Sequence, residues 1–126
     1  MIYYFEGAAH YRDAVLDVLR EIKALNPDAR IAISRLGVME CRVKPLREGN
    51  VELLARYEAF FMRALIVELS AAIVDVATDL RVSTALKTPD ALQAAGALSF
   101  ASACIFVTGD AGFMRVPQLV VRQVHV

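Results

Sequence analysis

The sequence predicts an α/β fold, namely a three-layer α/β/α domain with a mainly parallel central sheet. Two observations predict it. Short apolar or β-branched runs alternate with longer segments whose apolar residues recur at helical spacing. The short runs are apolar throughout, as expected for parallel strands that are covered on both faces. The 126 residues, 57% of them hydrophobic, suit a single domain spanning 1–126, and no linker or repeat interrupts them.

Composition excludes several classes of protein. The 14 basic and 14 acidic residues cancel, so there is no overall electrostatic drive toward nucleic acid. No apolar run reaches the roughly 18 residues of a membrane span, and the first residues lack the pattern of a signal peptide. Cys41 and Cys104 lie in apolar surroundings and are expected to be reduced core residues of a cytoplasmic protein.

The first half of the chain carries a local signal for each expected element. Residues 1–5 suit a strand or a helix, residues 9–25 an amphipathic helix, and residues 31–34 a buried strand. A helix is expected to begin within residues 37–41 and to stop at Pro45. Asn50 then caps a long helix with apolar residues at helical spacing: Leu53, Tyr57, Phe60 and Ala64, with Leu54 and Phe61.

The second half repeats the alternation. Residues 65–69 form a strand, and Ser70 caps a helix whose inner face is expected to hold Ile73, Val76, Ala77 and Leu80. The next helix runs from Thr88 as N-cap to about residue 100, with Pro89 at its first helical position. A strand at residues 104–108, a turn at 110–114 and a last strand at 119–121, or extending to 126, complete the chain.

Three carboxylates are expected to meet at one edge of the sheet. Glu40 follows the strand that ends in Ser34, Asp90 lies in the first turn of a helix, and Asp110 follows a strand directly. Strand carboxyl ends and the N-termini of crossover helices share one edge of such a sheet. Carboxylates gathered there repel one another, and Mg²⁺ or Mn²⁺ removes that penalty. The pattern therefore predicts metal-assisted hydrolysis of a phosphodiester.

Each acid taken alone also has a structural interpretation. Asp90 complements the helix dipole, and Asp110 suits a turn. Glu40 is able to pair with a nearby cation, for which the sequence offers Arg35, Arg42 and Lys44. The three acids taken together, in this order, favour the nuclease interpretation.

Four blocks of the chain resemble the PIN-domain ribonucleases, and most closely the VapC toxins of bacterial toxin–antitoxin pairs. Residues 2–7 (IYYFEG) resemble the segment that follows the first acid of the family, and residues 33–42 the second block, with Glu40 as its acid. Residues 88–95 (TPDALQAA) resemble the third block, with Asp90 as its acid. Residues 106–113 (FVTGDAGF) resemble the fourth, with Thr108 and Asp110 as its polar pair.

The resemblance implies an endoribonuclease that cuts structured RNA, such as tRNA or rRNA, with Mg²⁺ or Mn²⁺. It implies an antitoxin that blocks the site, and a homodimer. Asp90 and the first acid of the family are then the direct metal ligands, and Glu40 and Asp110 assist directly or through water. Thr108 and Ser34 position side chains or water. Arg42 and Lys44 are expected to contact RNA phosphates or an acidic antitoxin segment.

One departure from the family pattern separates two functions. Family members begin with a strand that ends in an acid, and no acid precedes Glu6 here. A start codon placed too late is the favoured explanation. A truncated, metal-poor variant and the use of residues 1–5 as the missing strand are the alternatives. The main hypothesis is therefore a ribonuclease toxin, and the alternative is a catalytically impaired PIN-like module that still binds an antitoxin or a second copy.

Overall fold

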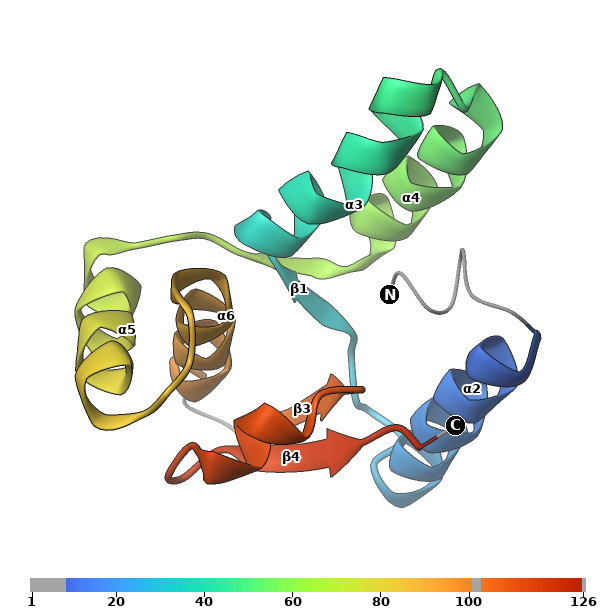
Figure 1. Ribbon diagram of the computed structural model, residues 1–126. Coiled ribbons are helices and arrows are strands. Elements are labelled where there is room, and N and C mark those ends of the chain that lie inside the picture. Colours follow the sequence, from blue (N-terminus) through green and yellow to red (C-terminus); the bar gives the residue numbers. More distant parts are fainter. Residues whose placement is uncertain (1–8, 101–102, 126) are drawn as a thin grey trace. The chain divides into compact units, whose positions relative to one another are not determined.

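The computed structural model describes residues 9–100 and 103–125, which form the helices and strands labelled in Figure 1. The expected strand or helix at residues 1–5 lies outside this part of the chain. The described residues divide into two compact units, of which the first holds residues 9–66 with His125 and the second residues 67–100 and 103–124. No described helix is both long and apolar enough to cross a membrane.

The first unit contains three helices and a short strand pair. Helix α2 (Ala9–Leu25) precedes strand β1 (Ala32–Ser34), and helices α3 (Arg35–Glu48) and α4 (Val51–Arg63) follow as a hairpin, seen in Figure 1. Strand β2 (Leu65–Val67) pairs with β1, beside a bond of 3.0 Å from the Leu65 amide to the Ile31 carbonyl. The predicted helix at about 9–25 is confirmed, and it ends at Leu25 as expected.

The core of the first unit lies between α3 and α4. Five buried residues from the two helices pack together: Val38, Cys41, Leu53, Tyr57 and Phe61. Tyr57 has no exposed surface, and its ring stacks on Phe61 with centroids 6.1 Å apart. Gly37 lets α3 approach β1, because a Cβ at this position would lie 2.9 Å from Cγ1 of Ile33.

Two predictions about α3 are wrong. The helix begins at Arg35, because Ser34 caps it with its Oγ accepting the Gly37 N–H at 3.0 Å. The helix also passes Pro45 and ends at Glu48. Pro45 is fully buried. The last turn of α3 closes through hydrogen bonds from the Gly49 amide to the Leu46 carbonyl and from the Asn50 amide to the Pro45 carbonyl. Burial and this C-terminal motif, with Gly49 at φ 63°, offset the hydrogen bond that proline cannot donate.

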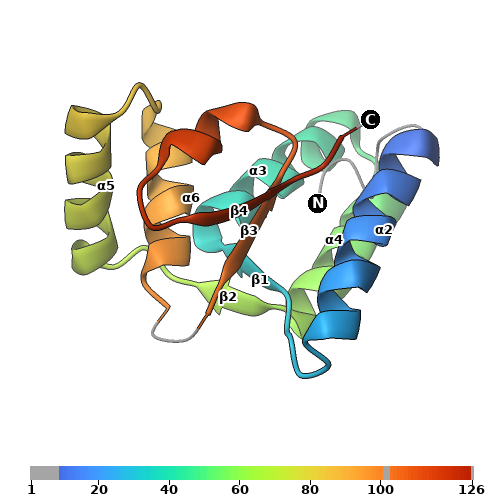
Figure 2. The ribbon, with the colours of Figure 1, turned by 90° about the horizontal axis from the view of Figure 1, so that it is seen from below.

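The second unit packs two helices against a parallel strand pair. Helices α5 (Ala71–Ser83) and α6 (Thr88–Leu98) lie side by side in Figures 1 and 2, followed by β3 (Ile105–Thr108), the 3₁₀ helix η1 (Ala111–Arg115) and β4 (Val120–Gln123). β3 and β4 are parallel, with Ile105 opposite Val120 and Thr108 opposite Gln123. Small residues on α6 let α5 and α6 pack closely. The core of the second unit holds these buried residues: Ile73, Ala77, Leu80, Leu86, Ala91, Ala94, Ala95, Phe113 and Val116.

The alternation of helices and strands and the parallel pairing confirm the α/β prediction, with three local corrections. The N-cap of α6 is Lys87 rather than Thr88, because the Ala91 amide already bonds to the Lys87 carbonyl at 2.9 Å. Val76 was expected on the inner face of α5 but is 39% exposed. In the described part of the chain β1, β2 and β3 are shorter than predicted, β4 spans 120–123, and the strands form two two-stranded sheets, β1–β2 and β3–β4.

Candidate acidic site

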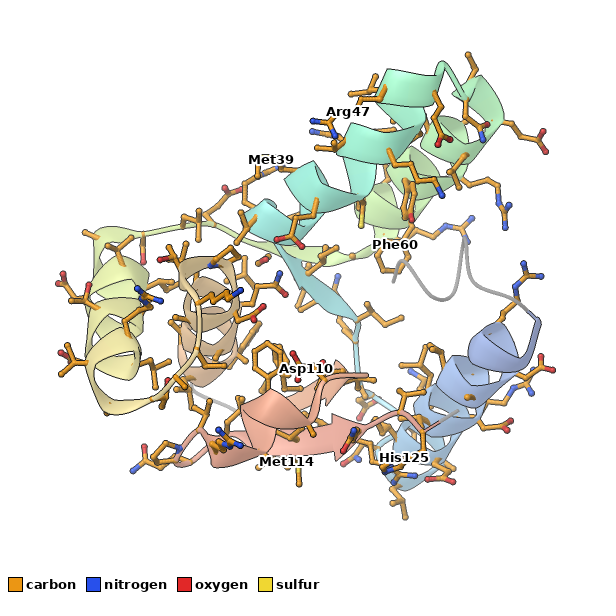
Figure 3. All side chains as sticks on the ribbon, in the orientation of Figure 1. Met39, Arg47, Phe60, Asp110, Met114 and His125 are labelled. Carbon is orange, nitrogen blue, oxygen red and sulfur yellow. The ribbon has the colours of Figure 1, made fainter. Side chains whose placement is uncertain are left out.

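Asp90 and Asp110 form an acidic pair in the second unit. Asp90 lies half-buried in the first turn of α6, where backbone N–H groups and the helix dipole stabilise a negative charge. Asp110 is exposed and follows β3 through Gly109, and Figure 3 shows it beside η1. Burial raises the pKa of Asp90, the charge of Asp110 raises it further, and Lys87 opposes both effects. The structure therefore brings two of the three predicted acids within electrostatic reach of each other.

Short hydrogen bonds fix the turn that carries Asp110. The Thr108 hydroxyl accepts the Asp110 N–H at 3.0 Å, and Oδ1 of Asp110 accepts the Gly112 N–H at 2.7 Å. The second of these bonds makes Asp110 the N-cap of η1. The ring of Phe113 in the same short helix packs against Phe106 of β3, with centroids 4.6 Å apart. Thr108 therefore shapes the turn that carries Asp110, and its expected part in the site stays a prediction.

Glu40 belongs to α3 in the first unit, where it is half-buried. Within residues 9–100 and 103–125, no three His, Cys, Asp or Glu side chains are grouped closely enough to hold a metal ion. The role of Glu40 as a third acid stays a prediction. Ser34, expected to position side chains or water, is engaged as the N-cap of α3.

Arg42 is engaged within the α3–α4 hairpin. Its Nε and Nη2 donate to Oε1 and Oε2 of Glu58 at 2.7 and 3.0 Å, and its guanidinium lies 5.5 Å from the centroid of the Phe61 ring. The hydrogen bond to Arg42 lowers the pKa of Glu58, and the same bond raises that of Arg42. Sequence reasoning missed Glu58, because only the register of two neighbouring helices brings residues 42 and 58 together. Contact of Arg42 and Lys44 with RNA or antitoxin stays a prediction.

The acidic pair suits a hard divalent cation. Mg²⁺ commonly takes one or two protein carboxylates and fills its other positions with water and substrate oxygens. Burial and the charge of Asp110 both oppose ionisation of Asp90, and a nearby cation would relieve this penalty. Cys104 is half-buried, and burial raises the pKa of its thiol, which disfavours the thiolate that soft metals require.

Comparison with known proteins agrees with this architecture. The PIN domain model matches residues 1–119. A VapBC2 complex from Rickettsia felis bound to a DNA fragment from its promoter contains a similar fold, with TM-score 0.74, 23% identity, and coverage of 98% of this chain and 92% of that one. A toxin–antitoxin complex from Klebsiella pneumoniae is also similar, with TM-score 0.62, 23% identity, and coverage of 90% and 93%. No curated protein matches the chain. Because the family model covers nearly the whole sequence, the chain belongs to the PIN-domain family.

Proposed function

We propose that the chain is a Mg²⁺- or Mn²⁺-dependent endoribonuclease that acts as the toxin of a type II toxin–antitoxin pair. The placement of Asp90 at the N-terminus of α6 and of Asp110 after β3 carries this proposal, together with burial and the Asp110 charge, which raise the pKa of Asp90. PIN domains are generally nucleases, and two similar folds come from toxin–antitoxin complexes. Structured RNA, such as tRNA or rRNA, is the proposed substrate.

The residues of the chain have distinct roles in this proposal. Asp90 and Asp110 hold the cation, with Glu40 as a third acid acting directly or through water. Thr108 keeps Asp110 in place through its bond to the Asp110 amide. A bound Mg²⁺ or Mn²⁺ supplies a water of lowered pKa and stabilises charge on the phosphodiester. Lys87, which opposes the rise in the Asp90 pKa, brings positive charge to the edge where the phosphate would lie.

RNA cleavage by the purified chain tests the proposal. Total tRNA and rRNA are incubated with Mn²⁺ or with EDTA, and the products are resolved on gels. The chain should cut only with metal, and Asp90→Asn or Asp110→Asn should lower the rate at least about 100-fold, since even outer partners of a metal site contribute 10–100-fold. Asp79→Asn, which removes an exposed acid from α5, is the matched control.

The same experiment addresses the alternative of an impaired binding module. Cleavage that persists unchanged in EDTA or in Asp90→Asn contradicts the metal assignment. An unaltered chain that cuts no RNA with any divalent metal, yet binds an antitoxin, is a binding module. RNA cleavage and antitoxin binding, measured on the same chain, therefore distinguish a nuclease toxin from a binding module.

An antitoxin and a second copy of the chain are the proposed protein partners. Three apolar residues of α3, spaced at i, i+4 and i+7, form what we call the α3 stripe: Met39, Val43 and Leu46, which are 55%, 38% and 61% exposed. Figure 3 shows Met39 and Arg47 on the side of α3 that faces away from α4. An apolar stripe of this spacing, with the basic Arg47 beside it, suits the apolar face of an amphipathic partner helix. The stripe therefore supports an antitoxin that presents apolar and acidic residues.

Charged substitutions test the α3 stripe. Leu46→Glu should weaken the complex with the antitoxin about tenfold or more, measured after co-expression, because it places a charge in an apolar contact. Met114→Glu, at a site 60% exposed on η1, is the control of similar chemistry. Equal binding by both variants would exclude the stripe as the docking surface. Sedimentation of the isolated chain measures the proposed homodimer separately.

A further inference from the structure

Helix α6 begins without a side-chain cap. Its N-cap residue, Lys87, makes no side-chain hydrogen bond to the first turn. By contrast, α3, α4 and α5 each begin with a side-chain oxygen that accepts a backbone N–H, from Ser34, Asn50 and Ser70. Asp90 lies in the uncapped turn. Pro89 stiffens this first turn, and further restraints on it come from the residues that precede Lys87.

The end of α5 holds this segment. Nη1 of Arg81 donates to the Leu86 carbonyl at 3.0 Å. The Thr84 hydroxyl donates to the Leu80 carbonyl at 2.6 Å and accepts the Leu86 N–H at 3.2 Å. The Leu86 side chain is itself buried in the core of the second unit. Both backbone polar groups of Leu86 are thus bonded to α5 or its C-cap residue, and its side chain is fixed by packing.

The restraint on Leu86 passes directly into the first turn of α6. Lys87 is the next residue, and its carbonyl accepts the first helical hydrogen bond, from the Ala91 amide at 2.9 Å. Asp90 lies within this turn. We propose that Arg81 is a positioning residue for Asp90, which fixes the first turn of α6 through its bond to the Leu86 carbonyl. Calling Asp90 a metal-binding acid rests on the proposed function, whereas the restraint on the turn does not.

Four variants test the role of Arg81. Arg81→Ala removes the bond to Leu86, and Arg81→Lys keeps a charge that donates one hydrogen bond. Thr84→Val removes the two bonds of the hydroxyl at nearly constant shape. Arg115→Ala, in the last turn of η1 and with an exposed side chain, removes an arginine elsewhere in the same unit.

Hydrogen exchange at the two ends of α6 is the first measurement. Arg81→Ala and Thr84→Val should speed exchange of the Ala91 amide about tenfold relative to the Ser99 amide, which bonds to Ala95 at the other end. Arg81→Lys should restore most of the protection. Arg115→Ala should leave the ratio unchanged.

Mn²⁺ binding and RNA kinetics are the second measurement. Arg81→Ala should weaken Mn²⁺ binding by roughly 3- to 10-fold and lower kcat with little change in KM, because an arginine–carbonyl bond that orders the turn is lost. An unchanged Ala91-to-Ser99 ratio in both Arg81→Ala and Thr84→Val would overturn the proposal. So would an equal rise at both amides, since that reports only a loss of global stability. The exchange ratio decides the positioning of Asp90, whereas Mn²⁺ binding and RNA cleavage by the unaltered chain separately decide the proposed function.

Discussion

At Asp90, partial burial and the charge of Asp110 act in the same direction, and both raise the pKa of the carboxyl group. The folded state therefore binds this proton more tightly than the unfolded state does. The resulting contribution to the free energy of unfolding is complete below the ordinary pKa of 3.8, and it is lost as the pH rises through the folded-state pKa. At neutral pH, therefore, burial and the Asp110 charge together outweigh the favourable effect of the α6 N-terminus on the ionised Asp90.

Removing this charge should stabilise the metal-free protein. In EDTA at pH 7, Asp90→Asn is expected to raise the free energy of unfolding by about 0.5 kcal/mol and Tm by about 2 °C. Thermal unfolding followed by circular dichroism measures the difference, which should vanish near pH 3, where Asp90 is protonated in both states. An Asp90→Asn chain less stable than the unaltered one at pH 7 would contradict the electrostatic account.

Gln118 adopts φ 65°, the only positive value at a non-glycine residue in the described part of the chain. This left-handed conformation is unfavourable for glutamine, whereas asparagine tolerates it. Gln118→Asn should therefore raise the free energy of unfolding by about 0.5 kcal/mol, as measured by urea denaturation. Gln123→Asn, in strand β4, is the control and should be neutral or destabilising. Equal effects at the two positions would rule out backbone strain as the cause.

At the scale of single elements, the pair of Arg42 and Glu58 joins α3 to α4. The hydrogen bond from Arg42 lowers the pKa of Glu58, so its contribution to stability is present above the ordinary pKa of 4.5 and is lost as the pH falls through the lower folded-state value. The two side chains are 39% and 42% exposed, so solvent screening limits that contribution.

Glu58→Gln should lower the free energy of unfolding by about 0.5 kcal/mol at pH 7, and by less as the pH falls through the folded-state pKa of Glu58. A double-mutant cycle with Arg42→Gln, read by urea denaturation at pH 7 and at a series of lower pH values, isolates the pair from other losses. A coupling free energy of zero at pH 7 would show that the ion pair contributes nothing to the hairpin.

Local sequence signals predicted elements well where the deciding contact is itself local. Asn50 and Ser70 cap α4 and α5 as predicted, because a cap depends on the three residues that follow it. The signal failed at Pro45, where burial and the bonds beyond Gly49 keep a proline inside a helix. It failed by one residue at Lys87, where the bond to Ala91 rather than a side-chain cap sets the start of α6.

At the scale of the whole molecule, the order of helices and strands predicted which acidic residues would lie near each other, which no local signal does. The α/β alternation placed Asp90 at a helix N-terminus and Asp110 after a strand, and the structure brings these charges together. The sequence did not predict which strands and helices pair, because such pairing depends on contacts between residues far apart in sequence. The bond of Arg42 to Glu58 and the separate β1–β2 and β3–β4 pairs are of this kind.

Asp90 and Asp110 are proposed to bind a divalent cation together. Calorimetric titration of the metal-free chain with Mn²⁺ measures this binding, alongside Asp90→Asn and the control Asp79→Asn. We expect a saturable isotherm for the unaltered chain and for Asp79→Asn, and an affinity at least about 100-fold weaker in Asp90→Asn. Equal Mn²⁺ affinity with and without the Asp90 carboxylate would show that the acidic pair does not hold the cation.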